Sequence, residues 1–171
     1  MNDPTRSVQK IQILGPIEKV WRELTKTGEP QMAVYGMQLD AGELKVGSPY
    51  LGRTPDGKWT IVAGEVTAIE PMRLFSHTMK FTRYEQPEEV HVIWTLEEIG
   101  GGVEVTLTQE NLVPGSRTSR DVVGGGKFIM GNLKAIVENG KLGFGTRVMY
   151  GMFGLLTPLI TPKRSRSENW R

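Results

Sequence analysis

The sequence predicts an α+β fold, in which an antiparallel sheet lies between an N-terminal and a C-terminal helix. Three observations support this prediction. Apolar residues from Ile17 to Leu24 recur with the spacing of a helix, and helical spacing returns between Lys127 and Asn139. Between these two segments, Gly and Pro residues mark turns about every ten residues. Strands that are grouped together, instead of alternating with helices, are typical of an antiparallel sheet.

A short strand and a helix open the chain. Residues 8–14 place Ile11 and Ile13 on one face, which indicates a strand. Gly15 is the expected N-cap of the helix and Pro16 its first residue, because the missing N–H of proline costs nothing there. The apolar stripe of this helix consists of Ile17, Val20, Trp21 and Leu24.

Six further strands follow, and with the first they give a curved sheet of about seven strands. Alternation is clearest in the last two, where Val, Leu and Trp take one face while Glu, Thr and His take the other. One face of the sheet is therefore expected to be buried. The expected strands are Gly36–Asp40, Ser48–Arg53, Lys58–Ile69, Leu74–Phe81, Val90–Glu97 and Val103–Gln109.

The second helix is predicted over Lys127–Asn139, with Gly140 as its stop signal, and a longer helix from Ser119 is the alternative. The glycines at 124–126 are expected to weaken its start and to make it flexible, as a gate would be. An apolar run and several basic residues come next. We therefore expect a domain at residues 1–147 and a hydrophobic, then basic, tail at residues 148–171.

Charge and cysteine content exclude several classes of protein. The net charge is +2, but residues 1–162 carry 17 Lys/Arg against 18 Asp/Glu, so the positive excess belongs to the tail. A basic face for nucleic acid is therefore not indicated. With no Cys, the chain has no disulfide, thiolate zinc site or cysteine nucleophile. No signal peptide is visible and residues 148–162 fall short of the roughly 20 needed to span a bilayer, so we expect a cytoplasmic protein.

Several short motifs follow one another in a recognisable order. They are Gly15–Thr25 in the first helix, Gly64–Val66 with Ile69–Pro71 and Arg73-Leu74 around the central strand, Trp94–Glu97 with Glu104–Thr108 in the last hairpin, and Asn132–Gly140 in the closing helix. Together they resemble the START-like SRPBCC superfamily, and within it the bacterial homologues of the activator of heat shock protein 90 ATPase. The resemblance spans about residues 8–145. It implies a helix-grip fold, in which the curved sheet grips the long C-terminal helix around an apolar cavity.

Such a cavity is the default site for a small apolar or amphipathic molecule. Large apolar side chains are the candidates for its lining, and plain core packing is the alternative for each of them. The candidate ligand-binding residues are Trp21, Tyr35, Met37, Tyr50, Trp59, Phe75, Trp94, Phe128, Met130 and Leu133. No cofactor is expected.

Catalytic chemistry has few candidates. His77 shares a strand face with Phe75 and is a weak candidate for an acid or base, with a packed or surface histidine as the alternative. His91 alternates with valines and is expected to face solvent, as is the carboxylate of Glu65. Two histidines without Cys indicate no metal site, and residues 124–127 lack the spacing of a phosphate-binding loop.

The tail and the whole chain each leave alternatives open. The tail docks on its own domain or on a second copy to form a homodimer, lies in a membrane interface with its basic residues near anionic lipid, or is disordered or cleaved. The leading hypothesis for the chain is binding of a small hydrophobic ligand without catalysis. The resemblance also implies a chaperone-associated interaction module, or an enzyme of the polyketide cyclase or aromatase type.

Overall fold

Eight strands form one antiparallel sheet in the computed structural model, which describes residues 3–170. The order across the sheet is β1-β8-β7-β6-β5-β4-β3-β2, so every strand from β2 to β8 pairs with its neighbour in sequence. The strands are β1 (Ser7–Leu14), β2 (Pro30–Gln31), β3 (Met37–Asp40), β4 (Pro49–Arg53), β5 (Thr60–Glu70), β6 (Leu74–Phe81), β7 (Val90–Ile99) and β8 (Gly102–Glu110). The α+β class is confirmed, with a two-residue β2 that the sequence did not predict.

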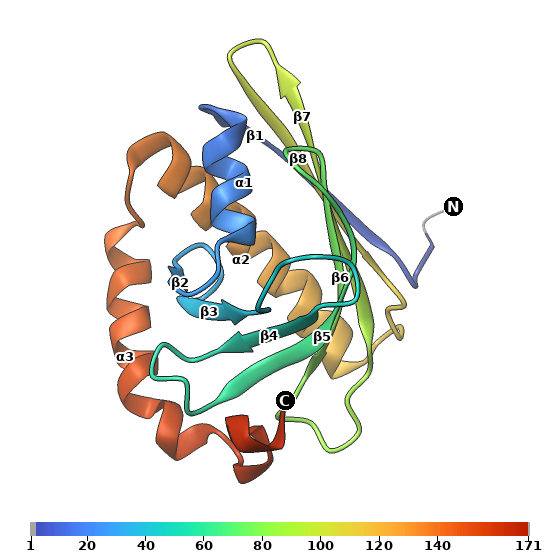
Figure 1. Cartoon of the computed structure of the whole chain (residues 1–171), viewed down its shortest axis with the longest axis vertical. Coiled ribbons are helices and arrows are strands. Elements are labelled where there is room, and N and C mark those ends of the chain that lie inside the picture. Colours follow the sequence, from blue (N-terminus) through green and yellow to red (C-terminus); the bar gives the residue numbers. More distant parts are fainter. Residues whose placement is uncertain (1–2, 171) are drawn as a thin grey trace.

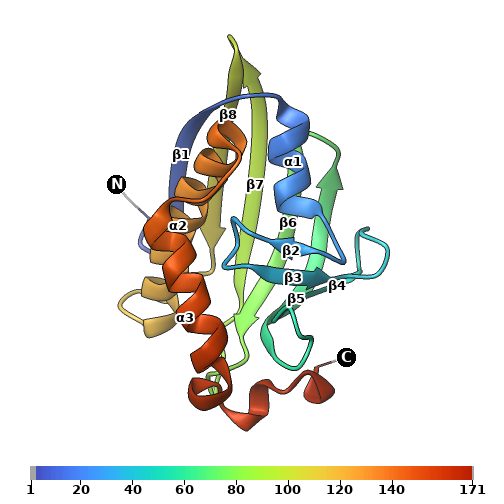
Figure 2. The same ribbon diagram turned by 90° about the vertical axis from the view of Figure 1, so that its left-hand side faces the viewer.

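The sheet curls around a long helix, α2 (Arg117–Asn139), with α1 (Ile17–Thr25) beside it (Figure 1). Two register shifts bend the sheet, at Gly52/Arg53 in β4 and between Val66 and Ala68 in β5. They turn β2–β4 across the end of the other strands, as the view in Figure 2 shows. This is the helix-grip arrangement that the resemblance implies.

Helix α2 begins where its backbone N–H groups are capped and ends at a glycine. The Ser116 hydroxyl accepts a hydrogen bond from the Ser119 N–H at 3.0 Å, which is a standard N-cap. Gly140 has a φ of 71°, the left-handed conformation that glycine favours after a helix. The predicted stop at Gly140 is confirmed, and the longer of the two predicted helices is the correct one.

The glycines at 124–126 lie inside α2, seven or more residues after its first residue, so they do not form its start as predicted. A Cβ atom at Gly126 would come within 2.7 Å of a Leu107 methyl carbon and 2.8 Å of the Gln109 amide nitrogen. That amide donates a 2.8 Å hydrogen bond to the carbonyl of Val122. Gly126 therefore lets the helix approach β8 closely enough for a side chain of the sheet to bind the helix backbone.

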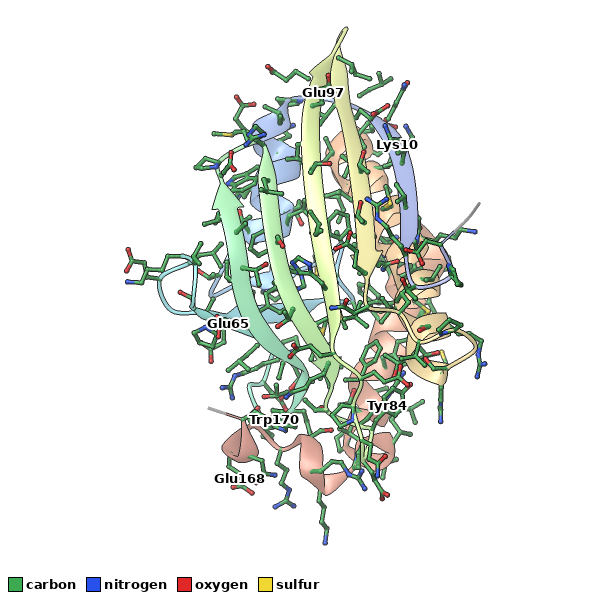
Figure 3. All side chains as sticks on the ribbon, turned by 90° about the vertical axis from the view of Figure 1, so that its right-hand side faces the viewer. Lys10, Glu65, Tyr84, Glu97, Glu168 and Trp170 are labelled. Carbon is green, nitrogen blue, oxygen red and sulfur yellow. The ribbon has the colours of Figure 1, made fainter. Side chains whose placement is uncertain are left out.

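The inner face of the sheet, α1 and α2 share one apolar core. The predicted stripes are buried: Val90, Val92, Trp94 and Leu96 on β7, with Val103, Val105 and Leu107 on β8. Three of the four stripe residues predicted for α1 are also buried, and Trp21 is half-buried. The opposite face carries polar side chains, among them Lys10 and Glu97 at one end of the sheet (Figure 3).

The predicted apolar tail is a helix, α3 (Phe144–Ile160), and the predicted division after residue 147 falls inside it. Two 3₁₀ turns follow, Lys163–Ser165 and Ser167–Asn169. Ser165 is fully buried, its hydroxyl lies 2.8 Å from that of Thr82, and the Ser167 N–H donates to the Lys58 carbonyl. The C-terminal segment thus docks on its own sheet, and Figure 3 shows Trp170 beside the strand ends.

Candidate ligand-binding cavity

A cavity of about 1120 Å³ lies between the curved sheet, the N-terminal half of α2 and α3. The sheet contributes apolar side chains from successive strands, such as Met37 on β3, Tyr50 on β4 and Phe75 on β6. Tyr150 and Phe153 of α3 line it as well. The volume lies slightly above the usual range for small-molecule sites, roughly 300–1,000 Å³.

Six of the ten predicted ligand-binding residues line this cavity: Tyr35, Met37, Tyr50, Trp59, Phe75 and Trp94. The other four, Trp21, Phe128, Met130 and Leu133, do not line it. Met130 and Leu133 are core residues, because the cavity reaches only as far along α2 as Ile129. Trp21 meets the edge of Phe75 with ring centres 6.4 Å apart, and Phe128 stacks on Tyr35 at 4.9 Å.

His77 is part of the cavity wall, on the same strand face as Phe75 and Met79. Its ring stacks on Tyr50 with centres 3.6 Å apart, and its Nδ1–H donates to the Thr78 carbonyl at 3.0 Å. Burial lowers the pKa of His77 to about 4, because the apolar wall disfavours its charged form. His77 is therefore neutral at pH 7, and the tautomer that donates from Nδ1 leaves Nε2 as a hydrogen-bond acceptor.

One end of the cavity is charged. Arg83, Arg117, Arg120 and Asp121 all belong to its lining, and Asp56 is a second acidic lining residue, so three positive groups stand against two negative ones in the whole wall. Arg83 forms an ion pair with Asp121, and the Tyr84 hydroxyl donates to the same carboxylate at 2.5 Å. The pairing leaves a net positive charge at this end, while the rest of the wall is mainly apolar.

An aromatic cluster connects α3 to the domain. Tyr35 has a φ of 55°, a left-handed conformation that is uncommon for a non-glycine residue, and its ring stacks on Phe128 of α2. Tyr150 of α3 lies 6.5 Å from Tyr35 and 6.4 Å from Phe128 between ring centres. Its hydroxyl donates to the Met32 carbonyl at 2.9 Å and accepts from the Asn132 amide at 3.2 Å. Desolvation raises the pKa of Tyr150, so this hydroxyl stays protonated.

Sequence reasoning missed the contributions of α3 and the arginines. The apolar run at residues 148–156 is the sequence signal for α3. By itself it predicts an apolar tail and does not show that the segment forms a wall of the cavity. Arg83 and Arg117 stand 34 positions apart in sequence, so no local pattern connects them. Gln109 and Gly124–Gly126 also line the cavity. Their place in the wall depends on how closely α2 approaches β8, which the sequence does not show.

The outer face of the sheet places three polar residues of different strands together. The hydroxyl of Ser76 lies 2.7 Å from Nε2 of His91, and Nδ1 of His91 lies 3.6 Å from a Glu110 carboxylate oxygen. This order resembles a hydrolytic triad, but Ser76 is 3% exposed and shares its hydroxyl with Thr67 at 2.6 Å. The cluster is a cross-strand hydrogen-bond network, and His91 lies on the outer face as the alternation predicts.

Glu65 is exposed on β5, near the point where the sheet bends (Figure 3), as predicted. Within residues 3–170, no three His, Asp or Glu side chains gather in a way that could hold a metal ion. In that same range, no helix is both long and apolar enough to cross a membrane.

Solved structures with this fold come from several bacteria. Protein MLL2253 from Mesorhizobium loti is 23% identical with a TM-score of 0.65, and the match covers 80% of this chain and 99% of that one. The Aha1 dimer from Colwellia psychrerythraea is 19% identical with a TM-score of 0.62, covering 80% and 98%. CalU16 from Micromonospora echinospora is 14% identical with a TM-score of 0.63, covering 91% and 87%. At these identities the likeness shows the fold alone.

The sequence itself was compared with family models and with curated proteins. No curated protein matches it significantly. The family model described as "Activator of Hsp90 ATPase homolog 1-like protein" matches residues 15–138, which run from the turn before α1 to the last turn of α2. That stretch holds most of the sheet and the greater part of the cavity wall. The chain therefore belongs to the family of Activator of Hsp90 ATPase homolog 1-like proteins.

Proposed function

We propose that the protein binds a small apolar or amphipathic molecule in the cavity between the sheet, α2 and α3. The observation that carries this proposal is a volume of about 1120 Å³ with walls of Met, Phe, Tyr and Trp side chains. The apolar walls favour a ligand whose own surface is largely apolar.

The charged end of the cavity supports an amphipathic ligand. Arg83 is already paired with Asp121, whereas Arg117 lies over the Tyr84 ring at 5.5 Å. A carboxylate, sulfate or phosphate group on the ligand would complement the net positive charge there. The apolar part of the ligand would then lie along Phe75 and Trp94.

His77 supports binding more than catalysis. A histidine with a pKa of about 4 is a weak base, and it holds almost no proton to give at pH 7. Its Nε2 acceptor would instead bind a hydroxyl or amide of the ligand in an otherwise apolar part of the wall. A cyclase-type activity would require this same residue to move a proton, so His77→Gln separates the two hypotheses when turnover can be measured.

The test is binding of dodecanoate and dodecanol, which share a chain and differ in the head group, by calorimetry and native mass spectrometry. Ile129→Trp would fill the cavity from α2, and we expect it to weaken binding about tenfold or more, given the cost of overpacking. Val113→Trp is the matched control on an exposed site outside the cavity. Arg117→Gln should remove any preference for dodecanoate. Equal binding by Ile129→Trp and the wild type, or no binding of either compound, would contradict the proposal.

A further inference from the structure

The outer face of α3 is an apolar stripe that nothing in the described chain covers. Phe144, Val148, Met152, Leu155 and Leu159 recur at helical spacing on the side opposite Tyr150, Phe153 and Thr157, which face the cavity. Leu155 is 80% exposed and Leu159 is 81% exposed. Helix α3 has no buried residue along its 17 positions. Figure 1 shows α3 at the edge of the molecule, on the far side from the outer face of the sheet.

The charges around this stripe have one sign. From Gly140 to Ser167 the chain has no Asp or Glu, and it carries Lys141, Arg147, Lys163, Arg164 and Arg166. Arg147 lies in the first turn of α3, Lys141 precedes the helix and Lys163 follows it, while Leu155 and Leu159 lie in its C-terminal half. Arg164 is paired with Glu85 and Arg166 with Glu168, whereas Lys141, Arg147 and Lys163 have no acidic partner among residues 3–170.

A second copy of the chain fits this surface poorly. Antiparallel pairing of two α3 helices about their middle would bring Lys141 of one copy close to Lys163 of the other. Parallel pairing would bring each basic residue near its own equivalent. Either arrangement places like charges together beside an apolar contact, which disfavours association. A partner with an apolar interior and a negatively charged surface would complement both the apolar stripe of α3 and the basic residues near its two ends.

We propose that the stripe of α3 docks on the surface of a lipid bilayer that carries anionic head groups. At 1.5 Å per residue the helix is about 26 Å long, and it would lie in the plane of the interface. The leucines would enter the boundary of head groups and acyl chains, while Lys141, Arg147 and Lys163 would meet lipid phosphates. The docking itself does not depend on a ligand in the cavity, although it would hold the cavity next to the bilayer.

Helix α3 lies outside the part of the chain that the family model describes, although the match to CalU16, at 91% of this chain, extends into it. Residues 144–171 lie beyond the segment that matches the family model, 15–138. The matches to MLL2253 and to the Aha1 dimer cover 80% of this chain but nearly all of those chains. This chain is therefore longer than those relatives.

Vesicle flotation of the full chain tests the proposal, with phosphatidylcholine vesicles and with vesicles containing about a third phosphatidylglycerol. We expect binding to the anionic vesicles only, and loss of binding at about 0.5 M salt. Leu155→Gln with Leu159→Gln should reduce binding at least tenfold. Lys141→Gln or Lys163→Gln should each reduce it about fivefold, the value of one basic residue near an anionic surface. The control is Leu14→Gln with Val46→Gln, two exposed apolar positions away from α3.

Each outcome of the flotation experiment either supports or contradicts docking of α3 on a bilayer. Circular dichroism melts confirm that each variant is folded before flotation is compared. Equal binding by the leucine variant and the control would overturn the proposal, and so would no binding by the wild type. Sedimentation analysis of the same samples detects a dimer that the leucine variant abolishes. Such a dimer, found together with no binding to vesicles, would show that the apolar stripe contacts a second copy of the chain. Failure of dodecanoate to bind would leave this result untouched, since the flotation assay does not involve the cavity.

Discussion

Helices α2 and α3 follow one another in the chain, yet their sequences specify them in different ways. Helix α2 has a serine N-cap, a left-handed glycine at its end and eight buried residues along one stripe. Helix α3 has no side-chain cap, contains Pro158 and has no buried residue. The first is held by the core of the domain. The second is held by a few contacts, chiefly those of Tyr150, and by the docking of the segment that follows it.

The difference shows how a binding surface can be added to a fold without changing its core. The buried stripe of α2 closes the core and leaves the cavity against its N-terminal half. Helix α3 then covers that cavity with one face and presents the other to the surroundings. We expect changes in α2 to act on stability and changes in α3 to act on association. The first prediction below tests this division, and the next two test how the sheet and α2 hold the cavity.

The largest expected effect comes from truncating a leucine on each helix. Leu133 is fully buried, so Leu133→Ala should lower the free energy of unfolding by about 3 kcal/mol, the usual cost of a lost side chain and the cavity it leaves. Leu155 is 80% exposed, and Leu155→Ala should change it by less than about 0.5 kcal/mol. Urea unfolding measures both. Similar losses in the two variants would show that α3 is as much part of the core as α2.

The next effect concerns the sheet side of the cavity and depends on pH. The pKa of His77 is about 4 in the folded protein against 6.5 in a model peptide, so between these values the unfolded chain binds a proton that the folded chain does not. Stability contributed by the neutral ring is complete above about pH 6.5 and falls as the pH drops toward 4. The loss attributable to His77 is on the order of 3 kcal/mol.

Urea unfolding at pH 7 and at pH 4.5 in the wild type and in His77→Gln isolates this contribution, because other titrating groups affect both proteins alike. We expect a smaller loss in the variant. An identical loss in the two proteins would show that this wall of the cavity is wet.

The smallest effect comes from two glycines of α2. A Cβ at Gly126 would press on Leu107 and Gln109, whereas nothing lies within 4 Å of a Cβ at Gly124. Gly124→Ala should therefore raise the free energy of unfolding by up to about 1 kcal/mol, since alanine is the better helix former. Gly126→Ala should lower it by about 1 kcal/mol or more, because the helix must shift from β8. Thermal melts of the two variants give the sign of each stability change. Equal gains in stability would show that the close approach of α2 to β8 at Gly126 is unimportant.

The elements with regular patterns were predictable from the sequence. The bounds of β6, Leu74–Phe81, agree with the prediction, and the alternation of β7 and β8 identifies their buried faces. Helix α3 was not predictable from periodicity, because apolar residues occur all around it and Gly145, Gly151, Gly154 and Pro158 have low helix propensity. The residues of β2 are too few to give a pattern.

The cavity was predictable in part. Six of its lining residues were predicted because they are large and apolar; Met37, Tyr50, Phe75 and Trp94 lie on strands, whereas Tyr35 and Trp59 lie beside them. The sequence also predicted correctly that Met130 and Leu133 point inward. How far the cavity extends along α2, however, depends on how the helix meets the bent sheet. The charged end required folding to bring Arg83 and Arg117 to the same Tyr84 ring. No spacing in the sequence encodes that arrangement.

The docking of the C-terminal segment has a consequence for how molecules enter and leave the cavity. Leu142 is buried just before α3, and Ser165 is buried just after it, so the helix is fixed at both ends. A segment held in this way is a strap, and it can bow outward but cannot swing aside like a hinged flap. Thin, flexible chains would pass under such a strap more readily than bulky rings, so the cross-section of a molecule would govern its rate of admission.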